Sequence, residues 1–197
     1  MMEIRQMNHP VFIIPGIGNS GPLHWQSLWQ ATHPDWRRLA LEDWDRVVCD
    51  DWVSAIERQV TLSGEKTVIV AHSLGCLAVA HWAVRHAVRI RGALLVAVPD
   101  PATPAFPAAA ATGFAPVPLE QLPFPTIVVS SSNDPYGSAD YVRTCAAAWG
   151  SELVEVGARG HLNAESNLGH WPEGFRLLET MDAKPKRRGK LSTNYQK

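Results

Sequence analysis

Short apolar runs alternate with stretches of helical periodicity along most of this chain, and this alternation restricts the possible folds more than any other feature. Runs typical of buried strands occupy residues 11–14, 67–70, 93–98, 126–129 and 152–156, and residues 36–41 fit a further short strand. Helical spacing of apolar residues is found in residues 23–32, 45–62, 76–82, 139–149 and 171–181. Strands that alternate with helices predict an α/β fold, with a compact, mostly parallel sheet covered by helices on both faces.

The length of 197 residues suits one domain with its own core. We expect that domain to span residues 1–182, because no internal linker divides it, and we expect residues 183–197 to form a disordered tail. Six basic residues and no acid lie in residues 184–197, so a total charge of -1 leaves -7 on the rest of the chain. Such an acidic body repels phosphate backbones, which argues against nucleic-acid binding.

The cysteines and the apolar segments indicate the compartment. Three cysteines, widely spaced and without a ligand pattern, favour a reducing environment and no structural metal. No run approaches the ~20 apolar residues of a membrane span, and the first residues lack the apolar stretch of a secretory signal. We therefore expect a cytoplasmic protein with no metal or other cofactor and with no membrane span; the sequence does not identify a protein partner.

Three residues at predicted strand ends suggest nucleophilic catalysis. Ser73 follows one strand in the stretch Ala71-His72-Ser73-Leu74-Gly75, which is almost Gly-x-Ser-x-Gly, and Asp134 and His161 follow later strands. A serine hydroxyl needs an imidazole to take its proton and a carboxylate to hold that imidazole in one tautomer. The chain order serine, acid, histidine is that of α/β-hydrolases, so we predict Ser73, Asp134 and His161 to be catalytic.

Each assignment except that of Ser73 has a competitor. Asp100 follows another predicted strand and is an alternative acid, although Asn133-Asp134-Pro135 suits a tight turn better. His170 is an alternative base, but it lies in the approach to the last predicted helix. His72 adjoins Ser73 in sequence and should project away from it at a sharp turn, which makes it a poor general base.

The loop after the first strand carries the other site predictions. Backbone amides of Ile17 and Leu74 are placed to stabilise an oxyanion, and Gly16 and His24 are candidates for substrate binding, although His24 also fits a core or helix-surface position. The glycines of this loop match neither common nucleotide-binding pattern, so we expect no nucleotide there.

Several motifs resemble one family, the small serine hydrolases similar to retinoblastoma-binding protein nine, within the α/β-hydrolase superfamily. The resemblance covers residues 10–182 and rests on Ile14-Pro15-Gly16 with His24-Trp25-Gln26, on residues 71–76, on residues 131–136, and on residues 160–163 with 169–174. It implies a three-layer α/β-hydrolase fold, catalysis by Ser73, Asp134 and His161, and esterase-like activity. Other small esterases carry alanine at the position of Ala71, so this departure does not weaken the likeness.

The segment 99–125 is too short for the cap domain that hydrolases often insert there. It fits either a surface loop or a wall in which Phe106 and Phe114 touch the acyl group. The sequence thus predicts hydrolysis of a small or medium carboxylic ester through an acyl-enzyme. Two alternatives stay open: a non-catalytic binding or adaptor protein on the same fold, and thioesterase, amidase or peptidase activity from the same residues.

Overall fold

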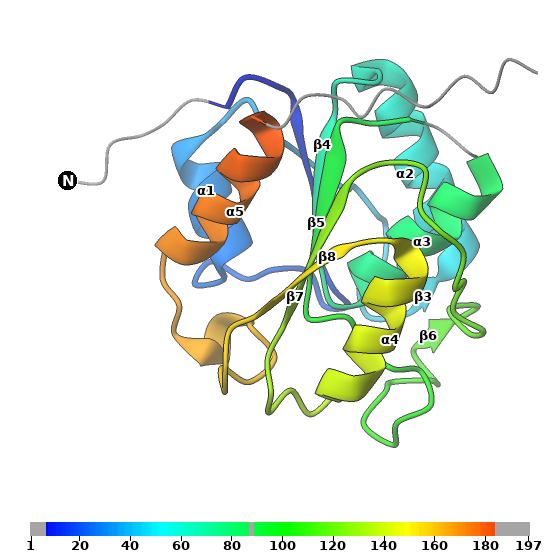
Figure 1. The fold of residues 1–197 in the computed structure, drawn as a ribbon. Coiled ribbons are helices and arrows are strands. Elements are labelled where there is room, and N and C mark those ends of the chain that lie inside the picture. The colour runs from blue at the N-terminus through cyan, green and yellow to red at the C-terminus, as the bar shows by residue number, and fades with distance from the viewer. Residues whose placement is uncertain (1–6, 87–88, 184–197) are drawn as a thin grey trace, which may run out of the picture.

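The predicted strands form a central sheet in the computed structural model, which describes residues 7–86 and 89–183 (Figure 1). Six strands lie in the order β2-β1-β4-β5-β7-β8, and every neighbouring pair is parallel. Their bounds are β1 (Val11–Ile14), β2 (Arg37–Arg38), β4 (Val68–His72), β5 (Gly92–Val96), β7 (Thr126–Ser130) and β8 (Glu152–Glu155). The expected parallel sheet is confirmed.

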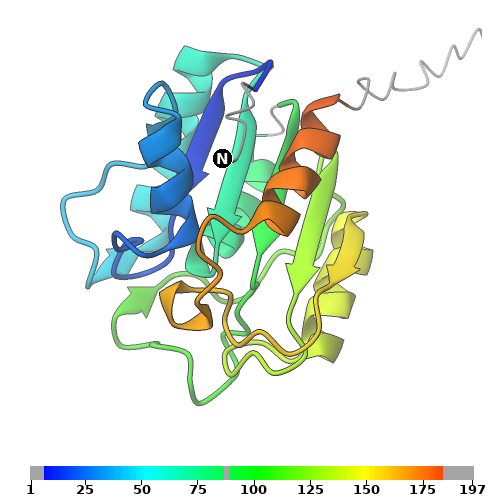
Figure 2. The ribbon, with the colours of Figure 1, turned by 90° about the vertical axis from the view of Figure 1, so that its left-hand side faces the viewer.

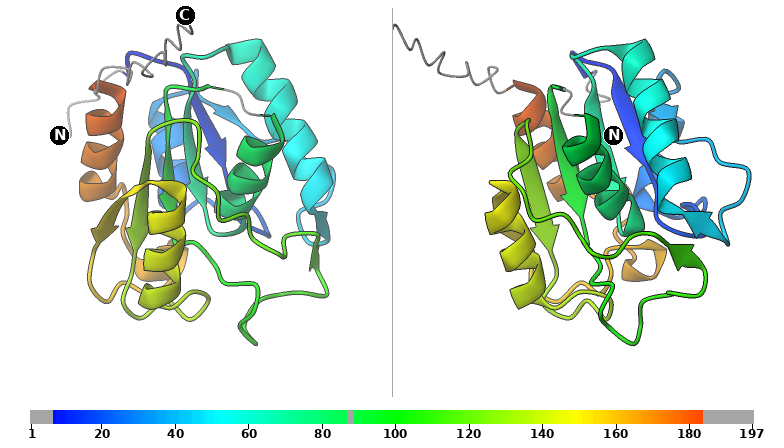
Figure 3. Two further views of the ribbon diagram at one scale, coloured as in Figure 1. Left: turned by 45° about the vertical axis from the view of Figure 1, so that its right-hand side comes forward. Right: turned by 90° about the vertical axis from the view of Figure 1, so that its right-hand side faces the viewer.

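Helices cover both faces of this sheet. One face carries α1 (Trp25–Thr32) and α5 (Pro172–Ala183), which lie side by side in front of the strands in Figure 2. The other face carries α2 (Cys49–Ser63), α3 (Leu74–His86) and α4 (Ala139–Trp149), which face the viewer in the right-hand view of Figure 3. The molecule therefore has three layers, as the sequence predicts.

The sheet divides the apolar interior into two cores. Along β1, Phe12 and Ile14 pack toward α2, α3 and α4, whereas Val11 and Ile13 pack toward α1 and α5. Because successive side chains of a strand point to opposite faces, a run that is apolar at every position must be buried on both. This explains why β1, β4, β5 and β7 are fully buried, whereas the edge strand β8 is not.

The structure differs from the expected elements in several places. The helix expected over residues 45–62 begins only at Cys49, because Val47–Val48 forms a short strand, β3. Strand β3 pairs in parallel with β6 (Ala111–Thr112), which lies within the segment expected to be irregular. The strand expected over residues 36–41 shortens to Arg37–Arg38. A short 3₁₀ helix, η1 (Ala164–Ser166), was not expected.

The carboxyl ends of the parallel strands meet at one edge of the sheet, which is the lower edge in Figure 2. The loops after β1, β4, β5, β7 and β8 gather there, and ligands of such sheets bind at this edge. Within the described residues no helix is long and apolar enough to cross a bilayer. Of the predicted tail, all residues beyond Ala183 lie outside the described residues.

Candidate active site

Ser73 lies in a sharp turn between the end of β4 and the start of α3. Its φ of 53° is in the left-handed region, which is unfavourable for a residue with a Cβ and marks a strained turn. Space for the turn depends on its neighbours: a Cβ on Gly75 would lie 2.5 Å from the carbonyl oxygen of Pro15, and one on Gly16 would lie 3.0 Å from the Cβ of Ser73. A side chain at position 75 would therefore meet the loop after β1, and one at position 16 would crowd the serine itself.

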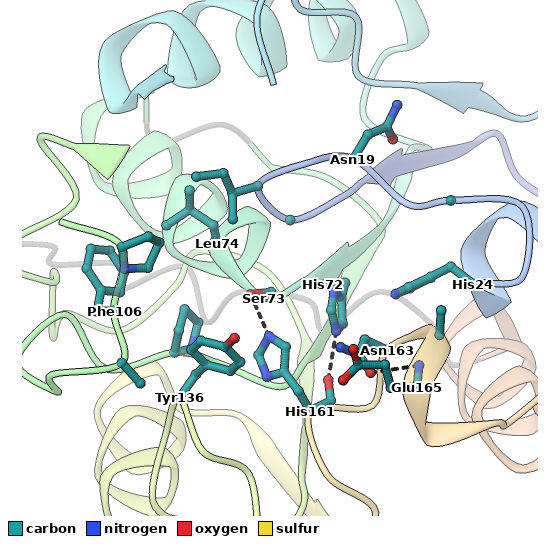
Figure 4. Close-up of a pocket in the computed structure, with 17 residues that line it drawn as sticks. Asn19, His24, His72, Ser73, Leu74, Phe106, Tyr136, His161, Asn163 and Glu165 are labelled. Carbon is teal, nitrogen blue, oxygen red and sulfur yellow. Dashed lines mark hydrogen bonds between the residues drawn. The ribbon is translucent and has the colours of Figure 1, made fainter. Parts of the chain in front are cut away.

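Ser73, His161 and Asp134 form one chain of hydrogen bonds. The Oγ atom of Ser73 is 2.8 Å from Nε2 of His161, and Nδ1 of His161 is 2.9 Å from both carboxylate oxygens of Asp134. The side chain of Asp134 is only 2% exposed and that of His161 9%. In this arrangement the imidazole can take the serine proton while the carboxylate fixes its tautomer. Figure 4 shows the bond between Ser73 and His161 at the centre of the pocket.

The competing residues have other contacts. Asp100 accepts a hydrogen bond from the amide of Ala102 (2.9 Å) and so closes its own turn. His170 is exposed, and its carbonyl accepts a hydrogen bond from the indole of Trp29. The ring of His72 bonds through Nε2 to the carbonyl oxygen of His161 (2.9 Å). The structure therefore brings Asp134 and His161, among the candidates, to Ser73.

Two backbone amides adjoin Ser73 in the pocket. Leu74 begins α3, so no carbonyl of the helix can accept its amide hydrogen. Ile17 lies in the loop after β1, and its amide donates to no other residue in the part of the chain that the structure describes. The next amide of that loop, on Gly18, donates to the carbonyl of Trp44 (2.8 Å) and fixes the loop. Both expected donors thus line the pocket, and within the described residues neither amide donates to another residue.

The pocket around Ser73 has a volume of about 410 Å³, within the range of small-molecule sites. Its lining is divided: Phe106 and Tyr136 lie on one side of the Ser73–His161 pair, whereas His24, Asn163 and Glu165 lie on the other (Figure 4). Ile17, Leu74, Pro99, Ala105 and Pro107 add further apolar lining. No lysine or arginine is among the described residues that line it.

The segment after β5 provides only one of the two expected phenylalanines. Phe106 lines the pocket. Phe114 does not: it is 1% exposed and packs edge-on against Trp52 in the core, with ring centroids 5.8 Å apart. The prediction for Phe114 is wrong because pairing of β6 with β3 carries this part of the segment onto α2.

His24 and Gly16, the candidates for substrate binding, line the pocket, and His24 also caps α1. The Nδ1 atom of His24 accepts the amide hydrogen of Gln26 (3.2 Å), and its ring packs edge-on against that of His72 at 4.7 Å. Burial is the main cause that lowers the pKa of His24 to about 3, and Arg38 and His161 contribute. Its imidazole is therefore neutral at neutral pH.

Several pocket residues were not predicted, among them Tyr136, Asn163 and Glu165. Tyr136 packs its ring against that of His161, with centroids 4.5 Å apart, and its amide donates to Asp134. The signal available for Tyr136 was its position two residues after the candidate acid. Asn163 caps η1 by accepting the amide hydrogen of Glu165, and both line the polar side. Asn163 lies two residues after the candidate base, so a similar signal was available for it, whereas the place of Glu165 depends on η1, which was not expected.

The described residues contain no group of three or more histidine, cysteine, aspartate or glutamate side chains that could hold a metal ion. Cys49, Cys76 and Cys145 are buried free thiols.

Comparison with known proteins extends this picture. Residues 11–180 match the family model described as serine hydrolase, while a search of curated proteins finds no significant match. A YdeN-like hydrolase from Pectobacterium atrosepticum is similar in structure, with 32% identity and a TM-score of 0.78 over 88% of this chain and 90% of that one. The ydeN gene product of B. subtilis shares 21% identity and a TM-score of 0.69 over 90% and 100%.

The fold recurs at lower identity. The type II thioesterase BorB from the borrelidin biosynthetic cluster shares 14% identity and a TM-score of 0.64, over 91% of this chain and 96% of its own. Together with the open parallel sheet and its two helical layers, these likenesses show a three-layer α/β-hydrolase fold. The family match covers nearly the whole described chain, and the chain therefore belongs to the serine hydrolase family.

Proposed function

We propose that this protein hydrolyses a small or medium carboxylic ester through an acyl-enzyme formed on Ser73. The observation that carries the proposal is the chain of hydrogen bonds from Ser73 through His161 to Asp134. It lies at a pocket whose lining is apolar on one side. Membership of the serine hydrolase family supports hydrolysis in general. The ester substrate and the residue roles are our inference from the geometry.

The reaction follows from the contacts of these three residues. Nε2 of His161 accepts the proton of Ser73 as Oγ attacks the ester carbonyl carbon, and Asp134 stabilises the imidazolium that forms. The amides of Ile17 and Leu74 stabilise the oxyanion. His161 then donates its proton to the leaving alkoxide, so the alcohol departs and the acyl group stays on Ser73. Water, deprotonated by His161, attacks the acyl-enzyme, and release of the carboxylic acid returns the proton to Ser73.

The pocket lining favours an apolar acyl group and a leaving group without phosphate. Phe106 and Tyr136 offer apolar contacts on one side of the serine, where an acyl chain loses contact with water, and Ile17 adds to the apolar lining. A thioester carried on coenzyme A or on a phosphopantetheine arm brings phosphate groups, which cationic side chains usually bind. Since no lysine or arginine is among the described lining residues, we favour a neutral ester over such thioesters.

The test is hydrolysis of matched substrates by purified wild-type protein and by Ser73→Ala. We expect p-nitrophenyl esters to be cleaved, with small neutral thioesters preferred over coenzyme A thioesters of the same acyl group. Ser73→Ala should keep the fold by circular dichroism and lose activity by up to ~10⁶-fold, as in triads that act as a unit. An inactive wild-type protein would instead favour a binding role, and full activity in Ser73→Ala would refute the proposal.

A further inference from the structure

The sequence His24-Trp25-Gln26 at the start of α1 has no part in the chemistry proposed above, yet it contacts the loop that carries His161. The indole Nε1 of Trp25 donates to the carbonyl oxygen of Leu162 at 2.8 Å. Trp25 is 1% exposed and Leu162 is fully buried, so water does not compete for this bond. The helix on one face of the sheet therefore holds the residue directly after the candidate base.

His72 holds the preceding carbonyl. Its Nε2 lies 2.9 Å from the carbonyl oxygen of His161, and this bond is drawn in Figure 4. A carbonyl oxygen only accepts, so Nε2 of His72 must carry the hydrogen. Burial is the main cause that holds the pKa of His72 well below its ordinary value, so the ring donates this bond as a neutral imidazole.

Two successive carbonyls of the His161 loop are thus held by side chains from two different elements. With both acceptors fixed, the peptide unit that joins His161 to Leu162 cannot rotate without losing a buried hydrogen bond. Leu162 has a φ of 49°, a conformation that a residue with a Cβ keeps only when its surroundings impose it. Ring packing adds to the restraint. The centroid of the His72 ring lies 5.0 Å from that of the His161 ring and 6.2 Å from that of the Trp25 ring.

We propose that Trp25 and His72 are positioning residues, which hold the His161 loop so that Nε2 of His161 stays within hydrogen-bond distance of Ser73. The inference rests on the proposed function, because it assigns no chemistry to either residue. Asp134 can fix the rotation of the imidazole ring through its bond to Nδ1, but it does not fix the backbone of His161, from which the ring projects. Displacement of a reacting group by about 1 Å can lower a rate ~10²-fold, so such a restraint has a measurable effect.

Trp29 offers a matched control for Trp25 on the same helix. It is also fully buried, and its Nε1 donates to a backbone carbonyl, that of His170, at 2.6 Å. Replacement of either tryptophan by phenylalanine removes one buried indole donor and leaves an aromatic ring. The two substitutions differ in the carbonyl oxygen that loses its hydrogen bond. In Trp25→Phe it is the carbonyl of Leu162, directly after His161, and in Trp29→Phe it is the carbonyl of His170, just before α5.

The experiment compares wild-type, Trp25→Phe and Trp29→Phe proteins by Tm, by kcat and KM for a p-nitrophenyl ester, and by the rate of inactivation with a fluorophosphonate. We expect both variants to lose a similar few degrees of Tm. We expect Trp25→Phe to lower kcat and the inactivation rate about tenfold or more with little change in KM, and Trp29→Phe to match wild type in both. Equal effects of the two variants on kcat, or none, would overturn the role of Trp25.

A second pair of variants tests His72 and keeps the proposal testable if Trp25→Phe does not fold. The amide nitrogen of glutamine can replace Nε2 of histidine as a donor, whereas leucine fills similar space without one. We expect His72→Gln to retain most of the wild-type inactivation rate and His72→Leu to lose about tenfold or more. Equal rates in the two variants would show that the donated bond does not position His161.

Failure of this inference can be told from failure of the proposed function. If the wild-type protein is not modified by the fluorophosphonate at Ser73, then the proposed function is wrong. If Ser73 is modified at a normal rate but the matched variants do not differ, then the proposed function stands and the positioning role is refuted.

Discussion

At the scale of single residues, the enclosed carboxylate of Asp134 is the feature on which the proposed chemistry depends most. It accepts hydrogen bonds from Nδ1 of His161 and from the amide of Tyr136, and its side chain is 2% exposed. An amide in its place can donate to Nδ1 and so stabilise the wrong tautomer of the imidazole. We expect Asp134→Asn to lower kcat by ~10⁴-fold for a p-nitrophenyl ester, with the fold retained.

The matched control is Asp100→Asn, since Asp100 is the other acid that follows a strand. It caps its own turn by accepting the amide hydrogen of Ala102, and an asparagine oxygen can accept that bond as well. We expect kcat for this variant to remain that of wild type. A large loss in Asp100→Asn with none in Asp134→Asn would reverse the assignment.

Phe106 should determine which acyl groups fit. It lines the apolar side of the pocket, and its replacement by alanine opens space for additional methylene groups. Because each buried methylene is worth about 0.8 kcal/mol, we expect kcat/KM of Phe106→Ala to rise about fourfold per added acyl carbon relative to wild type. The measurement is kcat/KM over p-nitrophenyl esters of graded length. An unchanged chain-length preference would remove Phe106 from the acyl site.

Residue order along the chain was sufficient to nominate Ser73, Asp134 and His161, because parallel strands bring their carboxyl ends to one edge whatever the details of packing. Residue order alone left Asp100 as a second candidate acid, since both aspartates follow strands of that sheet, and the preference for Asp134 rested on its tight-turn sequence Asn133-Asp134-Pro135. Sequence reasoning failed for Phe114, whose burial depends on a strand pairing between residues far apart in sequence. Residue positions that depend on topology were predictable, and those that depend on loop packing were not.

At the scale of elements, Gln26 ties α1 to the two neighbouring strands β1 and β4. It is fully buried, its Nε2 donates to the carbonyls of Ile14 (3.2 Å) and Val70 (3.1 Å), and its Oε1 accepts from Ser20 (2.6 Å). Leucine would leave these buried partners without bonds, at about 1–3 kcal/mol for each unsatisfied group. We expect Gln26→Leu to lower the free energy of unfolding by about 2–5 kcal/mol, measured by urea denaturation.

Gln59→Leu on α2 provides the comparison, because Gln59 bonds only to Ser63 on its own helix in the described structure. We expect a loss of about 0.5 kcal/mol or less, as is usual for substitutions near the surface. Similar losses in the two variants would show that Gln26 does not join α1 to the sheet.

Long elements could be predicted from the sequence, whereas elements of two or three residues could not. The long apolar strands were found because burial on both faces leaves a continuous pattern in sequence. Strands β3 and β6 are two residues each, too short for any period to be visible, and their pairing determines where α2 begins. The 3₁₀ helix η1 is three residues long and was missed for the same reason.

At the scale of the whole molecule, buried neutral histidines should make stability depend on pH. The pKa of His24 is about 3 in the folded state, lowered mainly by burial, against an ordinary value of 6.5. Between these values the unfolded chain binds more protons, so stability falls as the pH is lowered through this window. At pH 5.5 this histidine should already cost about 1.4 kcal/mol of stability relative to neutral pH.

The variant His24→Asn tests this effect, since asparagine retains the N-cap of α1 and cannot be protonated. We expect its free energy of unfolding to fall less steeply than that of wild type between pH 6.5 and 4.5. Identical slopes for the two proteins would show that His24 is not held neutral by the fold.

The most direct measurement of the central claim is covalent labelling of Ser73 by a fluorophosphonate, located by mass spectrometry of the digested protein. Labelling requires a serine that a neighbouring base activates, and it needs no knowledge of the natural substrate. We predict stoichiometric modification of Ser73 in the wild-type protein and none in His161→Ala. Labelling that is absent in wild type, that lies on another residue, or that persists in His161→Ala would contradict catalysis by Ser73 and His161.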